Sequence, residues 1–126
     1  MLTKRDLQAL RSLLRYSKSL PPPGDREQRD LHFALGVHKK VCVYGHNTFE
    51  PKGEYSDIHE YSTPHAESSV LLQMEDVTSL YVIRLNSKGE YLLSYPCSEC
   101  LNFIKLKKVR KLIYSIKDGL KKIYLI

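Results

Sequence analysis

The sequence predicts an α/β protein in which helices cover a mixed β-sheet. This prediction rests on the alternation of two kinds of segment along the chain. Short apolar segments typical of strands alternate with segments of helical periodicity. The expected order along the chain is helix, two strands, helix, strand, helix and two strands, which packs most naturally as a sheet with helices on its faces.

The length and composition suit one folded domain. The chain has 126 residues, of which 42% are hydrophobic and 27% are charged, as in an ordinary globular protein. No apolar run approaches the ~20 residues that cross a bilayer, and the N-terminus has no apolar signal region. We therefore expect a single domain over residues 1–126, located in the cytoplasm and without membrane contact.

The first expected helix covers residues 3–18. Thr3 can cap its N-terminus, and Asp6 in the first turn suits the positive end of the helix dipole. The Pro-Pro-Pro-Gly sequence at residues 21–24 ends this element. Leucines recur at helical spacing and define a buried stripe, which consists of Leu7, Leu10 and Leu14.

Two strands are expected next, over residues 31–37 and 40–44, with a hairpin turn at residues 38–39. The Gly-His-Asn sequence at residues 45–47 is expected to break the second strand. Residues 48–63 are polar and contain four acidic side chains, so they are interpreted as a long loop.

Prolines mark the starts of the two remaining helices. Pro64 suits the first turn of a helix over residues 65–74, and Pro96 opens a helix over roughly residues 97–107. Because each proline fixes the backbone at a helix start, the residues that follow it lie at a helix N-terminus.

The remaining strands are expected at residues 79–85, 110–115 and 122–126, and residues 91–95 either extend the first of these or pair with it. The Asp-Gly pair at residues 118–119 is a hairpin signal. The gap there is also too short for a parallel crossover, so the last two strands are predicted to be antiparallel.

The positive charge is concentrated at the two ends of the sequence. The total is +6, whereas residues 1–18 carry +4 and residues 105–122 carry +7, which leaves −5 for residues 19–104. Such ends could attract nucleic acid or phosphate. The simpler interpretation is a solvated face that keeps the protein soluble.

The chain has three cysteines, Cys42, Cys97 and Cys100. Cys42 alternates with valines in an expected strand, so we expect it to be a small core residue. A Cys-x-x-Cys pair in a chain without a signal region indicates a metal or redox site in a reducing compartment. The redox alternative is the weaker one, because no thioredoxin-like first strand unit precedes the pair.

Two short motifs carry the chemistry: His-Ala-Glu at residues 65–67 and Pro-Cys-Ser-Glu-Cys at residues 96–100. Two cysteines at the start of one helix can face one ion, and a histidine at the start of another can complete a three-ligand set. Three protein ligands leave zinc an open position for water, which is typical of a catalytic site. The expected zinc ligands are His65, Cys97 and Cys100. Glu67 is expected to reach the metal's water without being a ligand.

Together, the motifs match the H-x-E…P-C-x-x-C signature of zinc deaminases. From about Phe33 to the C-terminus, the sequence resembles the cytidine and deoxycytidylate deaminase superfamily. The resemblance implies a three-layer α/β/α sandwich with a five-stranded mixed sheet of cytidine deaminase type, and usually a homo-oligomer. It places the zinc-binding core at residues 64–107, after an N-terminal helical region at residues 1–20.

The resemblance also implies roles for individual residues. Residues 45–47 are similar to the family's Gly-x-Asn, so Asn47 is expected to contact the sugar. Ala66, Tyr95 and Pro96 are the other expected substrate contacts. Zinc would lower the pKa of its water to roughly 7. Glu67 would move the water's proton to the ring nitrogen and then to the leaving amine, which converts cytosine to uracil.

The substrate is the open question. A free cytosine nucleoside or nucleotide is favoured by Asn47, by the small size and by the acidic residues 50–60, which are awkward neighbours for a polyanion. Single-stranded DNA or RNA is the alternative, favoured by the pI of about 9.2 and the lysine-rich residues 105–122.

Two further alternatives have less support. Adenosine deamination is weakened because the expected antiparallel final strands differ from transfer-RNA adenosine deaminases. A non-catalytic protein that merely retains the metal is disfavoured by the intact Glu67.

Overall fold

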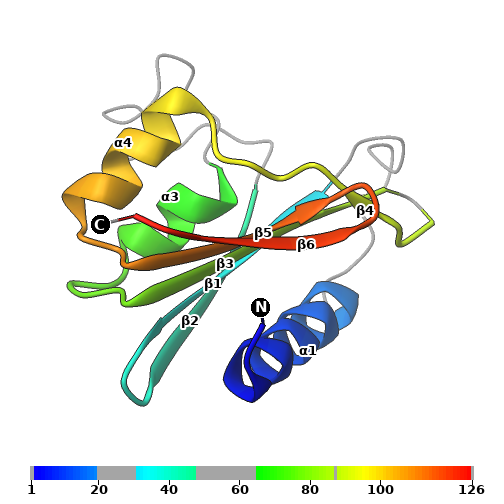
Figure 1. Ribbon diagram of the computed structural model, residues 1–126, viewed down its shortest axis with the longest axis horizontal. Helices are drawn as coiled ribbons and strands as arrows, with labels where there is room; N and C mark the ends of the chain where they lie inside the picture. Colours follow the sequence, from blue (N-terminus) through cyan, green and yellow to red (C-terminus); the bar gives the residue numbers. More distant parts are fainter. Residues whose placement is uncertain (1, 20–30, 48–64, 87, 126) are drawn as a thin grey trace.

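The computed structural model describes residues 2–19, 31–47, 65–86 and 88–125. They form a mixed sheet with helices on both faces (Figure 1). The helices are α1 (Lys4–Ser19), α3 (Ala66–Leu71) and α4 (Ser98–Leu106). The strands are β1 (Leu31–His38), β2 (Val41–His46), β3 (Ser79–Leu85), β4 (Tyr91–Leu92), β5 (Lys111–Ile116) and β6 (Gly119–Tyr124). Within the described residues, the expected order of helices and strands is confirmed.

The sheet has the strand order β2-β1-β3-β5-β6, and the two-residue β4 pairs with β3 outside this path. The pairing of β3 with β5 is parallel, and α4 lies in the connection between them. The other neighbouring pairs are antiparallel. The predicted antiparallel pairing of the last two strands is therefore confirmed.

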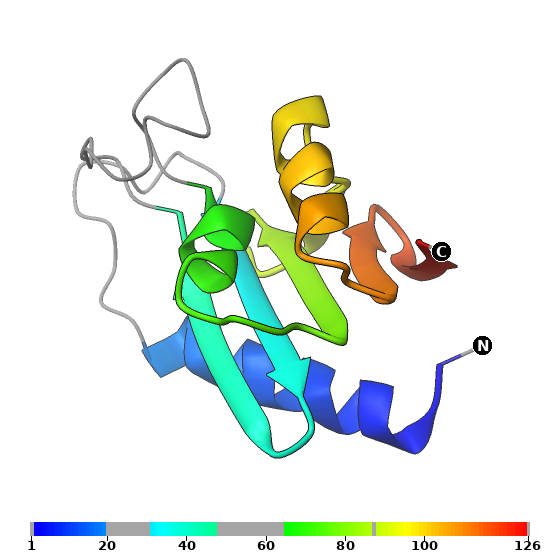
Figure 2. The same cartoon turned by 90° about the vertical axis from the view of Figure 1, so that its left-hand side faces the viewer.

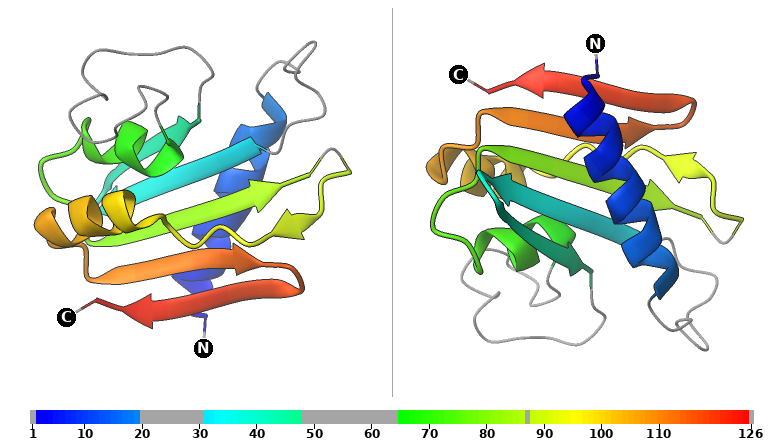
Figure 3. Two further views of the ribbon diagram at one scale, coloured as in Figure 1. Left: turned by 90° about the horizontal axis from the view of Figure 1, so that it is seen from above. Right: turned by 90° about the horizontal axis from the view of Figure 1, so that it is seen from below.

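The helices divide between the two faces of the sheet. In Figures 2 and 3, α1 crosses one face, and α3 and α4 lie against the other, which gives the expected three layers. Successive side chains of β3 pack into the cores on opposite faces of the sheet, since side chains alternate along a strand. Leu80 and Val82 belong to the core beneath α3 and α4, whereas Tyr81 and Ile83 belong to the core beneath α1.

A buried carboxylate anchors α1 to the sheet. Thr3 and Asp6 cap the helix reciprocally: the Asp6 amide donates to Thr3 Oγ1 (3.1 Å), and the Thr3 amide donates to Asp6 Oδ2 (2.9 Å). Across the layer boundary, Asp6 accepts hydrogen bonds from Tyr81 Oη (2.8 Å), Lys111 Nζ (2.7 Å) and Lys122 Nζ (3.0 Å). The predicted cap is confirmed, and the carboxylate also joins α1 to β3, β5 and β6.

Several element boundaries differ from expectation. The β1–β2 turn falls at residues 39–40, where Lys39 has a positive φ of 54°. Gly45 does not break β2 but pairs with Ala34 of β1. A side chain at Gly45 would lie 2.9 Å from Val70 Cγ2, so the glycine permits close packing of α3 rather than ending the strand.

The prediction that Cys42 is a core residue is wrong. Cys42 is exposed. It lies on the edge strand β2 and lines an open cavity on the α1 side of the sheet. Its neighbour Val43 points the other way and packs against the core beneath α3. The alternation of side chains along β2 correctly predicted which residues share a face of the strand. It did not predict whether a helix covers that face.

Other expectations fall on residues that the structure does not describe. These are the turn at residues 21–24, the loop at residues 48–63 and Pro64. Of the helices in the described ranges, none has the length and apolar character needed to traverse a bilayer.

Candidate metal centre

The candidate site lies where the N-termini of α3 and α4 meet above the sheet. His65 is the N-cap of α3 and Cys97 is the N-cap of α4, both in extended conformation. Ser68 fixes the start of α3, because the His65 amide donates to Ser68 Oγ (3.2 Å) and this hydroxyl donates to the His65 carbonyl (2.9 Å). Both predicted motifs therefore open helices, as expected.

Three ligand-type side chains converge at this point. His65 Nδ1 lies 3.5 Å from Cys100 Sγ and 3.9 Å from Cys97 Sγ. All three donor atoms lie within 4.8 Å of one another. Ordinary zinc–nitrogen and zinc–sulfur bonds in a tetrahedron place nitrogen and sulfur about 3.6 Å apart. The arrangement thus fits a single tetrahedral ion without rearrangement of the backbone.

The surroundings of the cluster favour a protonated Cys100 thiol as long as no cation is bound. Cys100 is buried, and burial raises the pKa of its thiol, as do the nearby Glu67 and Cys97. The Cys100 amide donates to Cys97 Sγ over 3.5 Å. A divalent cation bound at the cluster would instead lower the pKa of the Cys100 thiol, since it favours deprotonated thiols.

Glu67 is a buried carboxyl group with an unsatisfied oxygen. Its side chain is 3% exposed, and Oε1 has no hydrogen-bond partner among the described residues. Burial raises the pKa of Glu67 to about 7. A carboxyl group with this pKa can take and release a proton near neutral pH. An unpartnered oxygen also suits a site that is completed by a ligand.

The structure places Asn47 directly after β2. Its side-chain Oδ1 accepts a hydrogen bond from the His32 amide (3.0 Å), and its own amide donates to the His32 carbonyl (3.2 Å). These bonds hold the side chain at the end of the β1–β2 ladder. They use its oxygen, Oδ1, and the hydrogen-bond donor of the side chain is its Nδ2 group. The expected contact with a sugar stays a prediction.

The other expected substrate contacts differ in what they can present. Ala66 is fully buried, so the described structure does not expose it to a ligand. Tyr95 is 44% exposed, and its ring packs edge-on against Tyr114 with centroids 5.1 Å apart. Pro96 is buried. Their roles in substrate binding also stay predictions.

Sequence reasoning missed two groups that position the site. Gly36 and Gly45 let α3 approach the sheet, because a side chain at Gly36 would lie 2.5 Å from Val70 Cγ1. A buried serine pair fixes the segment before Cys97: Ser94 Oγ donates to the Val82 carbonyl (2.9 Å), and the Ser115 amide donates to Ser94 Oγ (2.7 Å). Glycines inside expected strands were the available signal for the first group.

The chain was compared with known families, curated proteins and solved structures. No family model and no curated protein matches the chain. Solved structures do match: cytidine deaminase from Burkholderia pseudomallei superposes with a TM-score of 0.60 at 12% identity, over 98% of this chain and 93% of that one. Cytidine deaminase from Mycobacterium leprae superposes with a TM-score of 0.58 at 14% identity, over 96% of this chain and 94% of that one.

Cytidine deaminase from Mycobacterium tuberculosis superposes with a TM-score of 0.53 at 14% identity, over 96% of this chain and 91% of that one. These similarities show a shared architecture along nearly the whole chain. The protein has the cytidine deaminase fold, and the fold class predicted from the sequence is confirmed.

Proposed function

We propose that the protein is a zinc-dependent deaminase that converts a cytosine base to uracil and releases ammonia. The observation that carries this proposal is the convergence of three donor atoms beside a buried, unpartnered carboxyl group. The cytidine deaminase fold supports it.

His65, Cys97 and Cys100 would hold the ion, since their donor atoms already lie within 4.8 Å of one another. Zinc bound there would act as a Lewis acid and make hydroxide available at neutral pH. The protein's own part is to hold these donors rigidly. The buried Ser68 and the Ser94–Ser115 pair support the two helix starts that carry them.

Glu67 would move the protons. With a pKa of about 7 it can accept a proton from water, transfer it to the ring nitrogen next to the reacting carbon, and protonate the leaving amine. Because Oε1 has no protein partner within the described structure, the carboxyl group need not break a hydrogen bond before it acts.

A free cytosine nucleoside or nucleotide is the proposed substrate, with Asn47 on the sugar and Tyr95, Pro96 and Ala66 around the base. The alternative is a cytosine in single-stranded DNA or RNA. Part of its support was the lysine-rich segment at residues 105–122, but Lys107 Nζ donates to the Met74 carbonyl and Lys111 faces Asp6 on the α1 side of the sheet. Lys107 and Lys111 are thus engaged in separate contacts, which favours the free nucleoside or nucleotide.

We also propose that the protein is a cytoplasmic homo-oligomer. The free cysteines suit a reducing compartment. Apolar side chains exposed at the sheet edge and around α4 suit self-association; they are Leu93, Leu106 and Tyr124. Light scattering of the purified protein measures its mass, and a monomeric mass at all concentrations would contradict the oligomer.

The test is a substrate panel on zinc-loaded protein. Cytidine, deoxycytidine, their monophosphates, adenosine and a cytosine-containing single strand are incubated separately, and ammonia and the product base are measured. We expect turnover of a free cytosine compound. Activity on the strand alone would select the alternative substrate, and no turnover by a protein shown to contain zinc would contradict the proposal.

A further inference from the structure

The outward face of α1 carries only positive charge. Lys4, Arg11, Arg15 and Lys18 are all exposed and follow one another at intervals of seven, four and three residues. This spacing keeps them on one side of the helix along about 21 Å. Asp6, the helix's single acidic residue, is buried against the sheet. Within the described residues, none of the four cations forms an ion pair.

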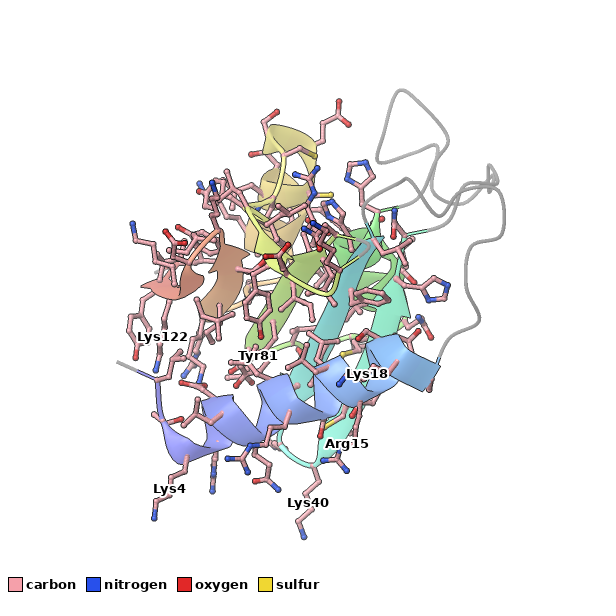
Figure 4. The ribbon with its side chains drawn as sticks, turned by 90° about the vertical axis from the view of Figure 1, so that its right-hand side faces the viewer. Lys4, Arg15, Lys18, Lys40, Tyr81 and Lys122 are labelled. Carbon is pink, nitrogen blue, oxygen red and sulfur yellow. The ribbon has the colours of Figure 1, made fainter. Side chains whose placement is uncertain are left out.

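A groove of about 860 Å³ lies beside this helix, between α1 and strands β1 to β3. Its charged lining is entirely cationic and consists of Arg5, Lys39, Lys40 and Lys111. Its apolar and aromatic lining includes Leu35, Val37, Tyr44 and Tyr81. Figure 4 shows Lys4 and Arg15 of α1 and Lys40 of the β1–β2 turn extending from the same side of the molecule.

From this arrangement we propose that α1 and the β1–β2 turn bind single-stranded nucleic acid. The phosphates lie along the cationic face of α1, where four regularly spaced positive charges meet a regularly spaced polyanion. An unstacked base enters the groove, whose volume is within the range of small-molecule sites. The occupant of the groove is therefore a base attached to the strand that α1 holds.

The shape of α1 favours nucleic acid over an anionic membrane. A helix that lies in a membrane surface inserts an apolar face. The apolar face of α1 is already used, because Leu10 and Leu13 are buried against the sheet. The prediction that Leu7 belongs to the buried stripe is wrong, because Leu7 is exposed. It is the only large apolar side chain that the described part of α1 leaves exposed.

This surface is separate from the candidate metal centre. The groove is lined by residues of α1 and of the strands beneath it. Figure 2 shows α3 and α4 on the opposite side of the sheet from α1. A strand bound along α1 would therefore be held without occupying the metal centre. The inference stands independently of the proposed deaminase activity, and a probe without cytosine keeps the two separate.

The test measures binding of a fluorescent oligothymidine of about 12 nucleotides, a length within the range of single-strand sites. We expect salt-dependent binding by the full-length, zinc-loaded protein, with a slope of about −3 for four phosphate contacts. The Arg11→Glu/Arg15→Glu variant should bind at least about tenfold more weakly. Both side chains are exposed, so circular dichroism of this variant should show an unchanged fold. The Arg11→Gln/Arg15→Gln variant perturbs the helix less and should also weaken binding.

The matched control is Lys105→Glu/Lys108→Glu, which changes the net charge equally at exposed positions of α4 and the turn after it. It should bind like the unaltered protein. Equal losses in the two charge-reversal variants would overturn the proposal, because they would mean attraction to net charge alone. Binding of anionic lipid vesicles without binding of the oligonucleotide would also overturn it.

Cys42 gives a residue-level readout, because it is exposed and lines the groove. Bound oligothymidine should slow alkylation of Cys42, measured as the modified peptide by mass spectrometry. Unchanged alkylation of Cys42 under saturating oligonucleotide would show that no base occupies the groove and would overturn that part of the assignment.

Discussion

Two buried carboxyl groups in this protein have opposite pKa shifts. Glu67 is buried with an unpartnered oxygen, and burial raises its pKa to about 7. Burial also acts to raise the pKa of Asp6, but hydrogen bonds from Lys111, Thr3, Lys122 and Tyr81 outweigh it and hold that pKa well below the ordinary range. Hydrogen-bond donors thus decide which of the two carries a proton near neutral pH.

The first prediction concerns Glu67. Glu67→Gln should lose at least about a hundredfold in kcat, because an amide cannot relay protons, and should keep its zinc. Activity and metal content are measured on the same sample. The control is Glu99→Gln, which removes an exposed carboxyl group from the first turn of α4 and should stay active. A Glu67→Gln protein with undiminished turnover would remove the proton-transfer role.

Residue types predicted most of the candidate site, because each carried local information. The prolines located two helix starts, and the donor chemistry of His65, Cys97 and Cys100 predicted their convergence. Cys42 was misassigned because exposure depends on where α1 crosses the sheet, which the strand's own alternation does not encode.

At the scale of elements, α3 is fixed by its close contact with two glycine positions. A Cβ at Gly45 would lie 2.9 Å from Val70 Cγ2, 3.0 Å from Ser69 Oγ and 3.1 Å from the Ala66 carbonyl oxygen. The last of these atoms belongs to backbone and cannot rotate away. The position of His65 therefore depends on the absence of a side chain on β2.

Gly45→Ala should displace α3, lower stability by about 1–3 kcal/mol and weaken zinc binding. Urea unfolding and competition with a zinc indicator measure the two effects. Truncating the opposing side chain provides the control: in Gly45→Ala/Val70→Ala, the stability loss should be smaller than the sum of the two single losses. Strict additivity would mean that the contact does not position the helix.

Metal removal should loosen the junction between α3 and α4. A chelator should release about one zinc per chain and lower the Tm by several degrees, because a tightly bound ligand adds stability to the folded state alone. The His65→Ala variant should neither bind zinc nor respond to the chelator. An equal drop in Tm for that variant would mean that the chelator acts elsewhere.

The elements were predicted in type and order, but less well in extent. Gly45 was expected to break β2 because glycine weakens a strand, whereas helix packing requires it there. Of residues 91–95, only Tyr91 and Leu92 pair with β3. Ser94 instead bonds to β5 through Ser115, a long-range contact that local periodicity does not reveal.

At the scale of the whole molecule, Asp6 links α1 to three strands, so its ionisation should govern acid stability. The unfolded chain protonates Asp6 near its ordinary pKa of about 3.9, whereas the folded protein does so only at lower pH. The stabilisation is therefore complete above about pH 5 and is lost as the pH falls through the folded-state pKa.

Asp6→Asn should cost about 2 kcal/mol at pH 7, since it leaves lysines without their carboxylate. It should also flatten the loss of stability between about pH 5 and pH 3. Urea unfolding at a series of pH values measures both effects. Identical pH profiles for the variant and the unaltered protein would show that Asp6 is not the responsible group.

The buried link at Asp6 joins residues that the ribosome makes at very different times. Lys111 and Lys122 follow Asp6 by 105 and 116 positions. A nascent chain that has produced α1 must therefore wait for β5 and β6 before the aspartate finds its lysine partners, so full docking of the first helix becomes a late event in biogenesis. Chains released before β6 would lack the bond from Lys122 to Asp6, so the first helix would be held less firmly against the sheet.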